Sequence, residues 1–223
     1  MKTQRLIQAA AIAVGLLVGV TACGGGDDGR KPSPVGTKEL CDGIFSPAAA
    51  KALETNLGVK KSELHSRGDS LDKTAELIVF EVDHFGVNPE NPTQYQFCSI
   101  YTPSRRGDLP ALDLTFELVD RSRFDDSSPA SSYDTYRMGR WSLASKNRSA
   151  IYFECASHKM ESTKRTPALI RTYLFKEEAS NDGSNIQEAN LTITHAAALA
   201  LARELECKDN GGLPTEPDLR PKP

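Results

Sequence analysis

Residues 112–118 read LDLTFEL, and this stretch decides the expected fold class. Apolar and polar residues alternate at a period of two, which places one side of an extended strand on a core and the other side in water. The other strand-like runs are 75–82, 94–101, 151–155 and 169–175, with 136–143 as a candidate sixth strand. The middle of the chain is therefore expected to form a β-sheet.

One helix is expected on each side of these strands in the chain. Ser46 and Pro47 begin the first helix, because a serine N-cap accepts a backbone N–H and proline suits the first turn, and Gly58 ends it. The second helix runs from about Glu188 to Cys207 and is apolar on more than half of its surface, so it should pack across the sheet. Because turn signals separate the strands, they are expected to pair antiparallel. The predicted fold class is α+β: an antiparallel sheet of about five or six strands packed with an N-terminal and a C-terminal helix.

The start of the chain has the three parts of an export signal. Lys2 and Arg5 precede an apolar core of about a dozen residues, and small residues precede Cys23. This core is shorter than the roughly 20 residues that a membrane-spanning helix needs. Val20-Thr21-Ala22-Cys23 resembles the lipobox of bacterial lipoproteins. The resemblance implies cleavage before Cys23 and a diacylglyceryl anchor on its thiol, which would hold the protein at the outer face of the cell membrane. The alternative is an ordinary secretory signal that contains a cysteine.

Composition divides the chain into four segments. Removal of residues 1–22 would leave 201 of the 223 residues, with 25 basic and 30 acidic side chains and a net charge of −5. This acidic balance argues against a nucleic-acid partner. Residues 23–36 are expected to form a flexible tether, 37–209 a single domain and 210–223 a disordered tail, because glycine, proline and charge dominate both ends.

Four cysteines remain once the lipid-bearing one is set aside, and an even number in an exported chain predicts two disulfides. The favoured pairing is Cys41 with Cys98 and Cys155 with Cys207, each joining a helix to a strand. The rival pairing joins Cys41 to Cys207, because terminal helices often pack together. A zinc site is not expected, since the gaps between these cysteines exceed fifty residues and the four histidines lack ligand spacing. Neither a metal nor a cofactor is predicted.

The layout as a whole resembles small secreted lipoproteins of actinobacterial type. The residues that carry this resemblance are the lipobox, Leu40-Cys41-Asp42 before the first helix, and 202–207 before 210–214. Most members of such families lack an assigned activity, so the resemblance implies an address and a layout and carries over no catalytic residue.

One short motif suggests an enzyme. Gly68-Asp69-Ser70-Leu71 resembles the nucleophile block of the GDSL hydrolases, which would make Ser70 the nucleophile. That family places the serine after a buried strand and adds an Asp-x-x-His pair downstream, and this chain has neither feature. A polar surface loop is the competing interpretation.

The expected function is therefore a non-enzymatic binding or interaction module at the cell envelope, with an envelope hydrolase using Ser70 as the alternative. Its partner would be an envelope protein, a wall polymer or a small ligand. A tethered structural spacer is the third possibility. A loose group of aromatic residues would mark a binding face if some of them were exposed together, although packing in the core explains aromatic residues more often. These residues are Tyr133, Tyr136, Trp141, Tyr152, Phe153 and Tyr173.

Overall fold

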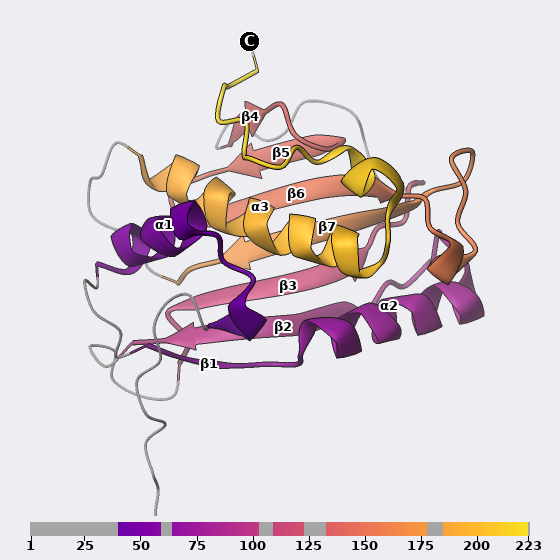
Figure 1. The fold of residues 1–223 in the computed structure, drawn as a ribbon, viewed down its shortest axis with the longest axis horizontal. Helices are drawn as coiled ribbons and strands as arrows, with labels where there is room; N and C mark the ends of the chain where they lie inside the picture. Colours follow the sequence, from indigo (N-terminus) through magenta and orange to yellow (C-terminus); the bar gives the residue numbers. More distant parts are fainter. Residues whose placement is uncertain (1–39, 59–63, 103–108, 123–132, 178–184, 223) are drawn as a thin grey trace, which may run out of the picture. The chain divides into compact units, whose positions relative to one another are not determined.

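Seven antiparallel strands form one sheet in the described part of the chain, and three α-helices accompany it (Figure 1). The computed structural model describes residues 40–58, 64–102, 109–122, 133–177 and 185–222. The elements in chain order are η1 Cys41–Gly43, α1 Pro47–Leu57, β1 His65–Arg67, α2 Leu71–Phe85, β2 Gln94–Tyr101, β3 Leu112–Leu118, β4 Asp134–Tyr136, β5 Trp141–Ala144, β6 Arg148–Cys155, η2 His158–Met160, β7 Ala168–Phe175, α3 Ile186–Glu204 and η3 Lys208–Gly212, where η marks a short 3-10 helix.

The strand order across the sheet is β1-β2-β3-β7-β6-β5-β4. Neighbouring strands pair antiparallel throughout, as the turn signals predicted. The expected count of five or six strands was too low. β1 and β4 contain three residues each, which is too short for a pattern of period two to show. The candidate strand at 136–143 is broken by a turn, with Tyr136 at the end of β4 and Trp141 at the start of β5.

Helix α2 corrects the largest error of the sequence interpretation, which placed a strand at 75–82. The run is rich in β-branched and aromatic residues, but its buried positions follow a helical period. The buried residues are Thr74, Ala75, Ile78, Glu81 and Val82. This spacing repeats over more than two turns of a 15-residue helix and outweighs the local β-propensity, which depends strongly on context. Gly86, with φ of +78°, ends the helix.

The two expected helices are present. The Ser46 hydroxyl accepts a hydrogen bond from the Ala49 N–H at 3.2 Å, and Gly58 ends α1 in the left-handed conformation. Helix α3 ends at Glu204, so Cys207 follows the helix instead of lying within it. Nearly every side of α3 is buried, because it packs against strands β5, β6 and β7 and against α1 and α2.

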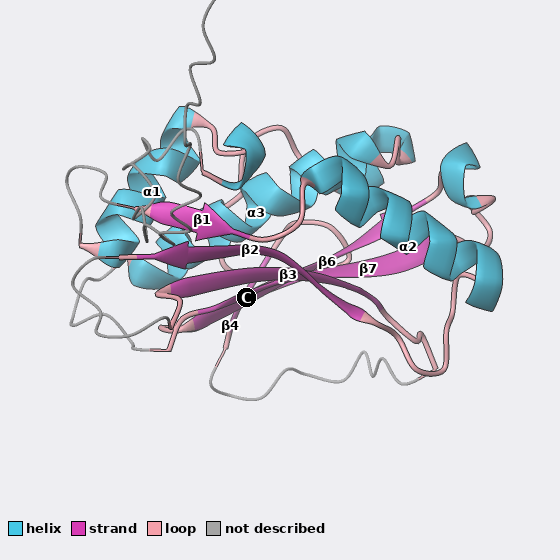
Figure 2. Cartoon of the chain, turned by 90° about the horizontal axis from the view of Figure 1, so that it is seen from below, coloured by secondary structure: helices cyan, strands magenta, loops and turns pink. Residues whose placement is uncertain are grey.

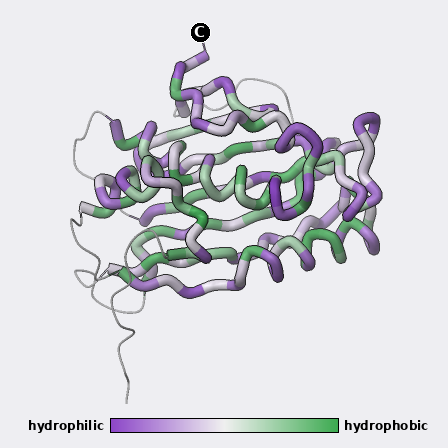
Figure 3. The backbone as a smooth tube through the Cα atoms, in the orientation of Figure 1, coloured by the Kyte–Doolittle hydropathy of each residue, from purple (hydrophilic) through white to green (hydrophobic). Residues whose placement is uncertain are grey.

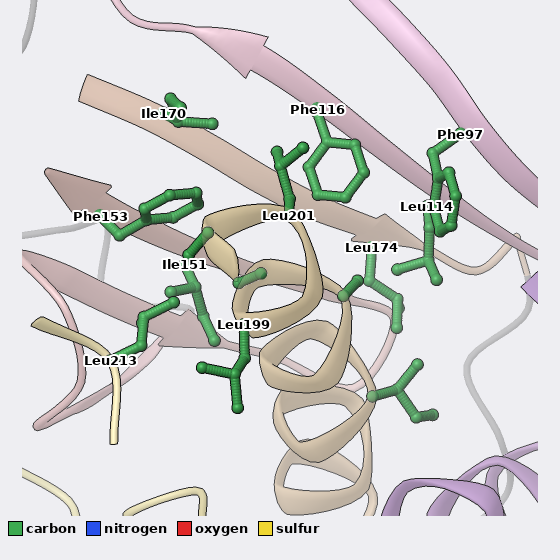
Figure 4. Packing of buried hydrophobic residues seen from close by; sticks show 14 of the residues in the cluster. Phe97, Leu114, Phe116, Ile151, Phe153, Ile170, Leu174, Leu199, Leu201 and Leu213 are labelled. Carbon is green, nitrogen blue, oxygen red and sulfur yellow. The ribbon is translucent and has the colours of Figure 1, made fainter. Parts of the chain in front are cut away.

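All three α-helices cover the same face of the sheet (Figure 2). The core lies between this face and α3, where Phe116, Ile151, Phe153 and Leu201 approach one another (Figure 4). Strands β3 and β6 contribute the first three of these side chains and α3 contributes Leu201, and hydrophobic residues recur along these strands (Figure 3). The helices therefore leave one face of the sheet uncovered.

The segment after α3 corrects a second expectation, that of a disordered tail at 210–223. Leu213 is 4% exposed and packs on the core, and Leu219 contacts the core as well. The Lys222 N–H donates to the Thr135 carbonyl at 2.7 Å, beside a bridge between Tyr136 and Pro221. The C-terminal boundary of the predicted domain thus moves from residue 209 to at least residue 222. Proline and charge suggested disorder, but a few apolar anchors and edge-strand hydrogen bonds are enough to hold the segment.

The predicted signal peptide, Cys23 and the tether lie outside the described residues. All described residues belong to one structural unit. None of the helices in the described ranges is long and apolar enough to cross a membrane.

Candidate functional site

Two disulfides join the cysteines in the pairing favoured from the sequence. Cys41 is bonded to Cys98, with their Cα atoms 5.6 Å apart, and Cys155 to Cys207, with their Cα atoms 4.8 Å apart. The first disulfide ties the segment before α1 to β2. The second ties the end of β6 to the segment after α3. Each closes a loop of more than fifty residues and thereby restricts the unfolded chain.

Ser70 has a structural role at the start of α2. It occupies the N-cap position, and its hydroxyl donates to the Asp72 carboxylate two residues along the chain. Gly68, in the same motif, lets β1 approach β2, because a Cβ there would lie 1.9 Å from the Phe97 carbonyl oxygen. The GDSL-like motif is thus a turn from strand to helix.

The four histidines make contacts elsewhere. His65 stacks on Tyr101, the His84 ring bonds the carbonyl of Phe80, His158 pairs with Glu206, and His195 bonds the carbonyl of Pro214. Within the described ranges, no hydrogen bond joins Ser70 to a histidine. The serine–histidine arrangement that a hydrolase nucleophile needs therefore has no geometric support here.

The face of the sheet that the described helices leave free, which we call the outer face, gathers half-buried aromatic residues. Trp141 pairs with Tyr152 across β5 and β6, and Tyr152 pairs in turn with Arg171 on β7. Tyr173 and Phe175 follow Arg171 on the same side of β7, because alternate residues of a strand share a face. We call Trp141, Tyr152, Tyr173 and Phe175 the aromatic row.

The structure thus divides the aromatic group noted in the sequence. Trp141, Tyr152 and Tyr173 belong to the outer face, whereas Tyr136 and Phe153 are core residues with exposures of 4% and 0%. Tyr133, just before β4, lies close enough to Tyr173 to affect its titration. Strand register, which a single sequence does not reveal, decides which aromatic residues are on which side.

Arginine side chains lie among these rings. The Arg171 guanidinium is 5.3 Å from the centre of the Tyr173 ring and forms an ion pair with Glu117 of β3. Burial alone would lower the pKa of Arg171, but Glu117 and Tyr152 outweigh it and raise this pKa. Arg148 lies 5.5 Å from the centre of the Phe175 ring. Burial acts in the opposite direction on the Tyr173 hydroxyl, whose pKa it raises. The outer face therefore carries arginines among its aromatic rings, and the charge of Arg171 is held in place by Glu117.

A cleft of about 710 Å³ opens at one end of the aromatic row. Its walls come from four parts of the chain: 139–141 at the start of β5, Glu154 and Ala156 at the end of β6, Lys164 and Pro167 before β7, and Lys208, Asp209, Gly211 and Gly212 in η3. Two glycines keep its backbone segments close to β6. A Cβ on Gly139 would lie 2.4 Å from the Tyr152 carbonyl oxygen, and one on Gly211 would lie 2.7 Å from Cδ2 of Phe153.

The charges lining the cleft leave two cations unpaired. Glu154 accepts a hydrogen bond from Arg121 at 3.0 Å and lies 3.7 Å from Arg140, so arginines surround this carboxylate. Among the described residues, the ammonium groups of Lys164 and Lys208 have neither an ion-pair nor a hydrogen-bond partner. The cleft thus offers an aromatic wall at Trp141 and two ammonium groups, beside the carboxylates of Glu154 and Asp209. Its cations outnumber its carboxylates, which suits a ligand with a flat face and an anionic group.

Sequence reasoning named Trp141 but missed the rest of the cleft. Arg140, Lys164 and Lys208 are far apart in the chain and carry no motif, so only the tertiary fold brings them together. No group of three or more metal-ligating side chains is found in the described ranges. Comparisons of the chain with protein-family models, with curated proteins and with solved structures give no match.

Proposed function

We propose that this protein is a lipid-anchored binding module of the cell envelope, tethered through Cys23 at the outer face of the cell membrane, and that it binds a wall polymer. The ligand would lie along the aromatic row and end in the cleft. The observation that carries this proposal is the position of Trp141, which belongs both to the aromatic row and to the wall of the cleft.

The address rests on the lipobox-like Val20-Thr21-Ala22-Cys23 and on the two disulfides. Disulfides persist in oxidising compartments outside the cytoplasm, which agrees with export. Cys23 and Leu40 are 17 residues apart, so the intervening chain can extend at most about 60 Å. A module on such a tether would reach only polymer close to the membrane.

The ligand class follows from the chemistry of the site. Sugar rings present flat C–H faces that pack on aromatic side chains, and acidic groups along a wall polymer would pair with Lys164 and Lys208. An elongated row of rings that leads into a cleft suits a chain-like ligand better than a compact one. An envelope protein and a small ligand, the other partners considered from the sequence, become outcomes of the test.

The binding test uses co-sedimentation of the purified, disulfide-bonded protein with isolated wall fragments. We expect Trp141→Ala to weaken binding at least about fivefold, because truncation of a central aromatic contact costs on the order of 1–3 kcal/mol. A Lys164→Glu/Lys208→Glu variant should bind wall fragments more weakly than Trp141→Ala does, and its binding should no longer depend on salt concentration. Tyr101→Ala provides the matched control, since Tyr101 is also half-buried but lies in β2, three strands away from β6.

Equal binding by the wild type, Trp141→Ala and the lysine double variant would overturn the proposed site, provided that all three melt normally. Binding to a membrane-protein extract in place of wall fragments would replace the polymer with a protein partner.

The anchor is tested separately. Cys23→Ala should move the protein from the membrane fraction to the soluble fraction, because two acyl chains hold a protein stably and none remain in this variant. Cys41→Ala serves as the control, since it removes a cysteine without touching the lipobox. Retention of Cys23→Ala in washed membranes would contradict lipid anchoring.

A further inference from the structure

Helix α2 carries an exposed aromatic surface far in the fold from the aromatic row. Phe80 is 55% exposed and Phe85 is 69% exposed, and only Leu109 joins them as a large, exposed apolar side chain among the described residues. Exposure of two phenylalanines on one helix is unfavourable in water, at about 25 cal/mol per Å² of apolar surface. Contiguous apolar surface of this kind marks interaction sites on soluble domains.

The exposed rings are held in a fixed arrangement. The His84 ring stacks on the Phe80 ring with centroids 3.9 Å apart, and its Nδ1 lies 2.8 Å from the Phe80 carbonyl oxygen. The centre of the Phe85 ring lies 6.3 Å from that of His84, and the two rings are tilted against each other. We call Phe80, His84 and Phe85 the aromatic ridge. Because the histidine is bonded to the backbone, the ridge loses little side-chain entropy when a partner covers it.

A groove of about 420 Å³ runs beside the ridge, between α2 and the C-terminal end of α3. Ala75, Val79 and Leu205 give it an apolar lining, and Phe80 belongs to both the groove and the ridge. Figure 3 shows hydrophobic residues recurring along α2 between hydrophilic ones. The groove is therefore apolar at the positions that a partner side chain would fill.

Carboxylates surround this apolar lining: Asp72, Glu76, Asp83 and Glu204. The hydrogen bond from Ser70 lowers the pKa of Asp72, which keeps it ionised. Lys159 also lines the groove, but its ammonium is bonded to the Glu204 carbonyl oxygen and to Glu206. In the described part of the chain, Glu76 and Asp83 have no ion-pair partner. The border is thus negative, and the charges of Glu76 and Asp83 have no counter-charge among the described side chains.

We propose that this acidic groove is a docking site for a basic amphipathic helix of a second protein. Leucine-like side chains of that helix would enter the groove beside Phe80, and flanking lysines or arginines would pair with Glu76 and Asp83. Asp72 and Asp83 are eleven residues apart on α2, or about 16 Å, which matches three turns of a partner helix. A helix usually binds a groove through an apolar strip, and charges that flank the strip on the helix pair with opposite charges on the border of the groove.

Charge selects this occupant over two others. An anionic membrane surface would be repelled by the four carboxylates, and a second copy of this chain would bring the same negative border to the contact. The inference does not rest on the proposed function, because the groove and the aromatic row share no residue.

The test measures the binding of two labelled probe peptides to the full-length exported protein by fluorescence anisotropy. One probe is an 18-residue helix of leucine and lysine, and the other has glutamate in place of lysine. We expect only the lysine peptide to bind. Phe80→Ala and Glu76→Lys/Asp83→Lys should each weaken this binding at least tenfold. Leu109→Ala and Asp134→Lys/Glu216→Lys are the matched controls, at exposed positions elsewhere, and should bind as the wild type does.

Several results would overturn the proposal. One is equal affinity for the two peptides, and another is equal weakening by the control variants, which would indicate attraction by net charge alone. Sedimentation that shows a dimer dissociated by Phe80→Ala would assign the ridge to a second copy. Binding of anionic vesicles that Phe80→Ala abolishes would assign it to a membrane. Because the substituted positions are exposed, thermal melts should stay within a few degrees of the wild type, which separates lost docking from lost folding.

Discussion

At the scale of single residues, two adjacent glycines show how the backbone shapes the cleft. Gly211 and Gly212 both have positive φ, at +67° and +78°. A Cβ on Gly211 would lie 2.7 Å from Cδ2 of Phe153, whereas a Cβ on Gly212 would meet nothing within 4 Å. The two positions therefore share the same conformational demand and differ in the space around them.

We expect Gly212→Ala to cost about 1 kcal/mol of unfolding free energy, the usual penalty for a side chain in the left-handed region. Gly211→Ala should cost at least about 1 kcal/mol more, because Phe153 is a fully buried core residue and can move only by disturbing its neighbours. Urea denaturation of both variants measures the difference. Equal losses would mean that η3 can shift away from β6 without cost.

At the scale of secondary-structure elements, the sequence predicted well where one signal acted alone. The capping residues Ser46, Pro47 and Gly58 located α1, and the strict alternation at 112–118 located β3. Prediction from the sequence failed where two signals competed. In α2, residues with high β-propensity occupy positions that repeat at the helical period, and the longer-range period prevailed because packing of a whole face outweighs local preference. Strand β1 was not predicted for another reason. Its three residues are polar and lie at the edge of the sheet, so they show no alternation of apolar and polar residues.

The candidate site was less predictable than the fold for a related reason. An aromatic residue contributes to a binding face only if strand register turns it outward, and register depends on partners far away in the chain. Trp141 and Phe153 looked equivalent in the sequence, yet one lies on the outer face and the other is fully buried. The lysines of the cleft come from a loop (Lys164) and from the short 3-10 helix η3 (Lys208), where no periodicity exists to reveal them.

Attachment of the C-terminal segment to α3 should depend on pH through His195. Its Nε2 lies 2.9 Å from the Pro214 carbonyl oxygen, and burial lowers the pKa of this histidine below its ordinary value of 6.5. The native state therefore favours the neutral ring. This contribution to stability is complete above pH 6.5 and is lost as the pH falls toward the lowered pKa, because the unfolded chain takes up the proton first.

The prediction is checked by urea denaturation between pH 7.5 and 5 together with hydrogen exchange at the Lys222 amide. The wild type should lose stability over this range, and the protection of the Lys222 amide, measured relative to the intrinsic exchange rate at each pH, should fall as His195 becomes protonated. His195→Gln, which keeps a side-chain donor but does not titrate, should show a flatter profile. An unchanged slope in His195→Gln would assign the pH dependence to other groups.

At the scale of the whole molecule, the two disulfides connect stability to the proposed function. They close loops of similar length, with sequence separations of 57 and 52 residues. In the chain-entropy model each should therefore contribute about 4 kcal/mol. Their positions differ, however. Cys155 and Cys207 directly precede Ala156 and Lys208, which line the cleft, whereas Cys41 is bonded to Cys98 in β2, near the other end of the strand order.

We therefore expect paired replacement of Cys41 and Cys98 by serine, and the same replacement of Cys155 and Cys207, to lower the unfolding free energy by similar amounts. Only the second variant should weaken the binding of wall fragments, because it frees η3 from β6 and lets Lys208 move away from Trp141. Co-sedimentation at a temperature where both variants remain folded measures this. Equal loss of binding would show that the cleft depends on global stability and not on the local tie between β6 and η3. Unchanged binding in both variants would place the ligand on the aromatic row alone, which would leave Trp141 as its last contact at that end of the sheet.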